Sequence, residues 1–173
     1  MRRLFISFAI LLCLVPLSRA GEGAVLKVLP QLLDEHGRAA LSPSLYERDA
    51  YQFHLRREPK LRGGARLAVE WKASHVDWAR LKLRAEIRCL LGDNLQTRTM
   101  EQPAVKKGFF RYWSEFRIEG KDYKNFGEIV AWRVTLLEGD RPLGQLESFL
   151  WSGVVNPPAA PAPRAPSPAP PRS

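Results

Sequence analysis

The chain has 173 residues, and 27 Lys and Arg residues against 18 Asp and Glu residues give a formal net charge of +9. The basic residues alternate with acidic ones instead of clustering, which argues against nucleic acid as a partner. Of the two cysteines, Cys13 lies in a segment that we expect to be removed, so Cys89 has no internal disulfide partner and the fold depends on its apolar core.

Residues 1–20 have the pattern of an export signal. Two arginines stand in the first three positions, an apolar run follows from Ile6 to Leu17, and Ala20 stands where a signal peptidase cuts. The run is shorter than the roughly 20 residues that a membrane span needs. We therefore expect cleavage after Ala20, no membrane span in the mature chain, and a periplasmic or extracellular protein. An uncleaved anchor is the alternative.

An apolar segment from Val25 to Leu33 is predicted to be the opening strand. Pro30 interrupts it and has no N–H for a sheet ladder, so we expect this strand to lie at an edge or to bend there. Residues 34–37 read as a turn, and residues 38–41 as a short return strand.

Residues 44–57 are predicted to form the one short helix. Ser44 and Glu47 have the spacing of a capping box, and Pro59 follows as a stop. The expected inner face, at helical spacing, consists of Tyr46, Ala50 and Phe53. A strand is the competing interpretation, because apolar and polar residues also alternate from residue 51 to residue 55.

Residues 67–73 and 81–89 have the clearest strand pattern, with apolar side chains at every second position and polar or charged ones between. The expected inward residues are Leu67, Val69, Trp71, Ala73, Leu81, Leu83, Ala85, Ile87 and Cys89. A shift of one residue would bury several charged side chains, so the register is tightly specified. Cys89 is predicted to be a small buried core residue, with an intermolecular disulfide or a reactive thiol as alternatives.

The rest of the chain continues in strands. Residues 95–101 follow a Gly-Asp-Asn turn and are polar, which predicts an edge strand that would permit pairing with another chain. Residues 109–119 predict a strand whose inward residues are Phe110, Tyr112, Phe116 and Ile118. Residues 120–127 read as a loop, and residues 128–151 as a hairpin that turns around Gly139.

Residues 153–173 differ in composition from everything before them. They are rich in Pro and Ala, with Ser and Arg, and lack large apolar residues beyond their start. Such a stretch cannot bury enough surface to offset the entropy of ordering, so we expect a disordered, extended tail. It is either a solvated tail without a partner or a spacer that contacts a polymer of the envelope.

About seven strands without crossover helices predict an antiparallel two-sheet sandwich over residues 21–152. Trp71 on an early strand, Cys89 on the next and Trp132 in the closing hairpin carry a resemblance to small uncharacterised exported bacterial proteins with an immunoglobulin-like β-sandwich. The resemblance implies that architecture and no named activity. The chain departs from the antibody pattern because it lacks a second core cysteine.

The sequence predicts no catalytic residues, no metal ligands and no cofactor. His36, His54 and His75 are not spaced as paired metal ligands, and there is neither a nucleophile elbow nor a phosphate loop. The carboxylates at Asp34 and Glu35 are interpreted as solvated ion-pair partners of nearby arginines.

A binding surface is predicted on the strand at residues 109–119. If its apolar residues face inward, the side chains facing outward are Phe109, Arg111, Trp113 and Arg117. Exposed aromatic and arginine side chains are typical of contact surfaces. Arg133 would extend this surface if the hairpin lies alongside. The alternative is that another element covers these residues.

The leading hypothesis is a noncatalytic exported domain that binds or scaffolds a protein or polysaccharide of the cell envelope. It rests on the export signal, the sandwich pattern, the missing catalytic motifs and the proline-rich tail. A carbohydrate-binding module that uses the aromatic and arginine face is the alternative. An enzyme with an unrecognised site is the second alternative.

Overall fold

The structure, a computed structural model, describes residues 21–107 and 111–153. The predicted export signal at residues 1–20 and residues 154–173 of the predicted tail lie outside the described residues. The strands are β1 (Glu22–Asp34), β2 (Arg62–Ser74), β3 (Leu81–Leu91), β4 (Asn94–Pro103), β5 (Tyr112–Glu119), β6 (Glu128–Glu138) and β7 (Arg141–Glu147). The helical segments are α1 (Leu45–Arg57), η1 (Pro59–Leu61), η2 (Trp78–Arg80), α2 (Gly120–Lys124) and α3 (Phe149–Gly153).

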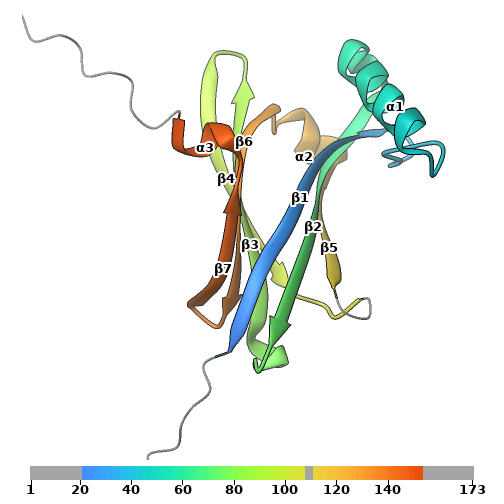
Figure 1. Ribbon diagram of the computed structural model, residues 1–173. Coiled ribbons are helices and arrows are strands. Elements are labelled where there is room, and N and C mark those ends of the chain that lie inside the picture. The colour runs from blue at the N-terminus through green and yellow to red at the C-terminus, as the bar shows by residue number, and fades with distance from the viewer. Residues whose placement is uncertain (1–20, 108–110, 154–173) are drawn as a thin grey trace, which may run out of the picture.

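The strands form two antiparallel sheets that face each other, with α1 projecting beyond one end (Figure 1). The three-stranded sheet, here sheet A, has the order β1-β2-β5, and the four-stranded sheet, sheet B, has the order β4-β3-β6-β7. The predicted antiparallel sandwich of about seven strands is confirmed. The predicted closing hairpin is β6–β7, and it turns at Gly139, whose φ of 61° suits a residue without a Cβ.

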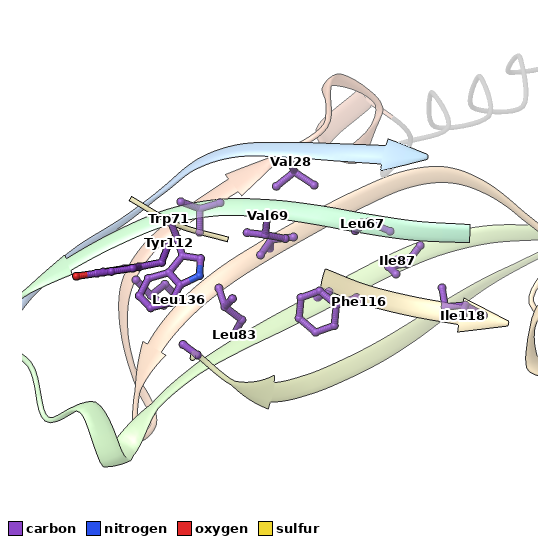
Figure 2. Packing of buried hydrophobic residues seen from close by; sticks show 14 of the residues in the cluster. Val28, Leu67, Val69, Trp71, Leu83, Ile87, Tyr112, Phe116, Ile118 and Leu136 are labelled. Atoms are coloured by element: carbon purple, nitrogen blue, oxygen red, sulfur yellow. The ribbon is translucent and has the colours of Figure 1, made fainter. Parts of the chain in front are cut away.

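The core fills the space between the sheets with side chains from five strands (Figure 2). The alternation predicted for β3 is confirmed, because its inward positions are at most 2% exposed. The most enclosed large side chains come from both sheets: Trp71, Phe116, Leu67, Leu83, Ile87 and Leu136. Each contributes about 1.5–3 kcal/mol on burial. Cys89 is buried and unpaired as predicted, and burial raises the pKa of its thiol.

The opening strand β1 lies at an edge of sheet A, as Pro30 predicted. On its outer side the amide of Gln52 in α1 takes the position of a neighbouring strand. Gln52 Oε1 accepts from the Leu32 N–H at 2.8 Å, and Gln52 Nε2 donates to the Leu32 C=O at 2.9 Å. No register shift separates Pro30 from Leu32, so the side of Pro30 that lacks an N–H also faces outward.

The expected return strand at residues 38–41 is wrong. The turn after β1 is closed by Asp34, whose N–H donates to the Arg38 C=O at 2.9 Å, and the chain then leads directly into α1. A second amide bond of Gln52, to the Ala39 C=O at 2.7 Å, holds this segment against the helix. The helix therefore covers the edge that a return strand would have used.

The helix at residues 44–57 is confirmed, but its expected inner face is wrong. Tyr46, Ala50 and Phe53 are exposed, and the buried residues of α1 are Gln52 and Leu55. The expected capping box also fails, since the Ser44 side chain makes no capping hydrogen bond. The helix contacts the sheet edge through the Gln52 amide and buries Leu55, whereas the predicted apolar stripe is exposed.

Two further short helices replace expected loop and strand. The segment at residues 120–127 begins with α2, whose first residue, Gly120, has a φ of 60°. The second strand of the hairpin ends at Glu147, because Ser148 bonds to Trp132 twice and the chain then turns into α3. The described chain therefore has several short helices instead of the single one expected.

Candidate binding surface

The predicted binding residues of β5 lie on the outer face of sheet A. Trp113 stands opposite Glu70 of β2 and is 38% exposed, so part of its ring is open to solvent. Arg117 follows on the same face, and Arg111 precedes the strand. Phe109, the fourth residue predicted there, lies outside the described residues, as does Phe110.

The arginines of this face are held by carboxylates of the same face. Arg111 Nη1 lies 3.2 Å from Glu70, and Arg117 Nε donates to Glu119 at 2.9 Å. The bond to Glu119 raises the pKa of Arg117 above its ordinary value. These exposed ion pairs contribute little to stability, but they reduce the free charge that the surface offers to a ligand.

Arg133 does not extend this surface. It lies on β6, which belongs to sheet B, whereas β5 belongs to sheet A. Its guanidinium makes two hydrogen bonds of 2.8 Å with the carboxylate of Glu86, opposite it on β3, and these bonds lower the pKa of Glu86. The condition under which Arg133 would join the predicted site is therefore not met.

Arg133 instead helps to hold α3 on the outer face of sheet B. The buried ring of Trp151 has the guanidinium carbon of Arg88 4.1 Å from its centroid and that of Arg133 4.7 Å away. Arg88 Nη1 also donates to the Trp151 C=O at 2.7 Å. This contact fixes the point at which the chain leaves the sandwich, and the hairpin pattern gave no indication of it.

An apolar surface that we did not predict lies on α1. We call Leu45, Tyr46 and Phe53 the α1 apolar face; they are 65%, 84% and 57% exposed. Leu41, just before the helix, is also exposed. Arg57 is the one described cation over this face, with its guanidinium carbon 5.7 Å from the Phe53 ring centroid. The helical spacing of Tyr46 and Phe53 was visible in the sequence, but it indicated burial in this chain's own core.

A small cavity of about 160 Å³ lies between α1, α2 and the adjoining strand ends. Its polar lining groups include Gln52, Arg62 and Glu128. The Gln52 amide is already bonded to Leu32 of β1 and to Ala39, and Arg62 donates to the Leu55 C=O at 2.6 Å, where it caps the end of α1. Most of the polar lining therefore already serves the fold, and the volume is below the roughly 300 Å³ of typical ligand pockets.

Within residues 21–107 and 111–153, no three His, Cys, Asp or Glu side chains are arranged to hold a metal ion. In the same part of the chain, no helix has both the length and the apolar character needed to cross a bilayer.

Comparison with protein-family models, with curated proteins and with solved structures gives no match to this chain.

Proposed function

We propose that this chain is a noncatalytic exported domain that binds or scaffolds a protein of the cell envelope through the α1 apolar face. The observation that carries the proposal is the exposure of Leu45, Tyr46 and Phe53 on a helix that is held firmly to the sheet edge. Large apolar side chains gathered on one ordered element are typical of contact surfaces. Export rests on the sequence of residues 1–20.

The strand order supports an immunoglobulin-like assignment of the sandwich. Strands one, two and five share one sheet, and strands three, six and seven share the other, as in immunoglobulin constant domains. The difference is β4, which pairs with β3 here instead of joining the first sheet. Sandwiches of this kind commonly serve as binding modules, although a fold by itself does not determine a function.

The test compares capture of an envelope protein by the wild-type chain and by a Tyr46→Ser/Phe53→Ser variant. We expect the variant to lose at least about tenfold in affinity, because truncating aromatic anchors removes most of the energy of a contact. Its melting temperature should not change, since both side chains are exposed. Val105→Ser, at another exposed apolar position, is the matched control. Equal capture by all three chains would refute the proposal.

Trp113 favours a second candidate, a carbohydrate-binding module. Its partly exposed ring stands on a sheet face beside Glu70 and Arg111, which could hydrogen-bond to a sugar stacked on the indole. Affinity electrophoresis in gels that contain soluble glycans tests this candidate. Retardation of the wild-type chain that Trp113→Ala abolishes would support it, and unchanged mobility in every glycan would count against it.

A further inference from the structure

Contacts within the chain cover part of three of the four sheet edges. The edge of β1 carries Pro30 and the Gln52 amide. The edge of β7 lies against β1 so closely that a Cβ on Gly144 would be 2.6 Å from the Gly23 carbonyl oxygen. Covered edges prevent the sheet from pairing with other chains.

The edge of β5 is covered by the segment that leads into it and by β4. The Trp113 N–H donates to the Lys107 C=O at 3.4 Å, and Gln102 Nε2 donates to the Glu115 C=O at 3.2 Å. Two of the main-chain groups on the outer side of β5 are therefore already bonded.

The remaining edge, that of β4, is open. Ala104, just after β4, donates its N–H to the Leu81 C=O of the β3 side at 2.9 Å, so the even-numbered residues of β4 bond to β3. The odd-numbered residues consequently direct their N–H and C=O groups away from the sheet. Within residues 21–107 and 111–153, no hydrogen bond reaches the main chain of Leu95, Thr97 or Thr99.

The residues of this edge favour pairing rather than prevent it. Proline appears only at the end of β4, as Pro103, and Thr97 and Thr99 are β-branched residues suited to a strand. Arg98 is the only charged residue between Leu95 and Thr99. Three consecutive outward residues without a main-chain hydrogen bond in the described part of the chain, and a nearly neutral centre, make the β4 edge suited to strand addition.

We infer that β4 pairs antiparallel with β4 of a second copy of this chain, with Thr97 on the two-fold axis. This register joins Thr97 to Thr97 and Leu95 to Thr99 of the other copy, in both directions, so each outward N–H and C=O of these residues finds a partner. It also places Arg98 opposite the neutral amide of Gln96. In the single chain these two side chains already lie 3.2 Å apart, so the groups suit each other.

Two other registers are poorer. Centring the pair on Arg98 sets two arginines directly opposite each other, which is destabilising. Centring it on Thr99 brings Pro103 into a bonding position, where it has no N–H to donate. Of these three registers, the Thr97 register alone keeps the two arginines apart and needs no N–H from Pro103; its cost is that Glu101 faces Asp93 of the other copy. Because it buries little apolar surface, the dimer should be weak and should depend on protein concentration.

Single cysteines test the register. The full chain is expressed with Cys13→Ser and purified in the form that the host accumulates. Cys89 is buried, so it should not compete with the introduced cysteine for disulfide formation. Thr97→Cys should form a disulfide-linked dimer, since Cα atoms about 5.5 Å apart across such a pair are within disulfide range. Thr99→Cys should stay monomeric, because its two copies would lie about 13 Å apart. Cross-linking at position 99 alone, or to a different protein only, would overturn the proposal.

A second pair of variants tests the main-chain bonds. Thr97→Pro removes an outward N–H and no bond to β3, so the monomer should keep its fold, as β1 does with Pro30. We expect analytical ultracentrifugation to show a dimer dissociation constant at least about tenfold higher for this variant. Thr97→Val keeps the N–H and should dimerise like the wild type. A wild-type chain that remains monomeric at all concentrations, or a Thr97→Pro variant that is folded and dimerises equally well, would refute the pairing.

Discussion

Asp34 is the most heavily bonded carboxylate among the described residues. It is only 4% exposed, and it accepts hydrogen bonds from the His36 N–H, the Arg38 N–H, Arg38 Nε and the Tyr51 hydroxyl at 2.8–2.9 Å. Burial by itself would raise its pKa, but these four donors outweigh it and lower the pKa from 3.8 to about 2. The predicted ion pair of Asp34 with a nearby arginine is present, with Arg38, but the carboxylate is buried instead of solvated. It closes the turn after β1 and connects that turn to α1.

Replacing Asp34 with Asn should lower the free energy of unfolding at neutral pH by about 2–3 kcal/mol, because the charged acceptor is lost. The pKa of this carboxyl is depressed in the folded state, so its contribution is fully present above about pH 5 and is lost as pH falls through 3.8 towards about 2. Urea unfolding of both chains at several pH values measures this. The difference between them should shrink over that acidic range.

Glu35→Gln is the matched control for this experiment. Glu35 neighbours Asp34 but is exposed, and we expect almost no change in stability. If both variants showed the same loss at neutral pH, the hydrogen bonds of Asp34 would not be the reason.

At the scale of the element, the Gln52 amide is one of the contacts that position α1, beside the buried Leu55 and the bond from Tyr51 to Asp34. Gln52→Glu would leave the C=O groups of Leu32 and Ala39 without their donor and would place a carboxylate at a site that is only 6% exposed. We expect a loss of about 3 kcal/mol in unfolding free energy, because two C=O groups lose their donor. Gln31→Glu is the control, because its oxygen already accepts from Arg66 Nε at 2.9 Å and a carboxylate keeps that bond. Equal losses would contradict the account.

The attachment of α3 depends on Trp151. Trp151→Ala should release α3 from sheet B and cost about 1–3 kcal/mol, because the contacts of Arg88 and Arg133 with the ring are lost while the sandwich stays folded. Limited proteolysis should then cut near residue 148 much faster than in the wild type. Phe149→Ala, at a side chain that is 94% exposed in the same helix, should leave both stability and cleavage unchanged.

Periodicity was enough to predict β3 and its buried face, because alternation leaves this strand only one register that keeps its charged residues out of the core. It was not enough for residues 38–41, which form no strand. It failed on α1 for a physical reason. The spacing of Tyr46 and Phe53 shows that an apolar face exists, but not which side of the helix the sheet edge will bind. The contact is made by Gln52, a polar residue whose role appears only when the Leu32 main chain is brought beside it.

At the scale of the whole molecule, the sandwich is tight on one side. Gly144 on β7 meets the backbone of β1, where a Cβ would lie 2.6 Å from the Gly23 oxygen and 2.8 Å from the Ala24 Cα. Gly144→Ala should therefore force these strands apart and cost about 1–3 kcal/mol. Gly23→Ala should cost less, since its Cβ would mainly meet the movable side chains of Leu136 and Leu143. Thermal unfolding of the two variants ranks them, and the reverse order would contradict this packing.

The candidate site was less predictable than the fold because it depends on which strands share a sheet. Trp113 and Arg117 were placed correctly on one outer face by alternation within β5. Arg133 was not placed correctly. The pattern of residues 128–138 identifies a strand, but it does not show that this strand pairs with β3 instead of β5. The carboxylates that hold Arg111 and Arg117 likewise come into place only through pairing and local folding.

Trp151 also has a mechanical consequence. The described chain enters β1 at one end of the sandwich and leaves through α3 at the other (Figure 1). A force applied between residues 21 and 153 would act along the strands. As long as Trp151 keeps α3 attached to sheet B, the hydrogen bonds between β1 and β2 would be loaded in shear and would have to break together. A force applied across the β6–β7 turn would instead break the hydrogen bonds between these two strands one at a time. Optical-tweezers experiments should show a higher unfolding force for the first geometry. The Trp151→Ala variant should resist that force over a shorter extension.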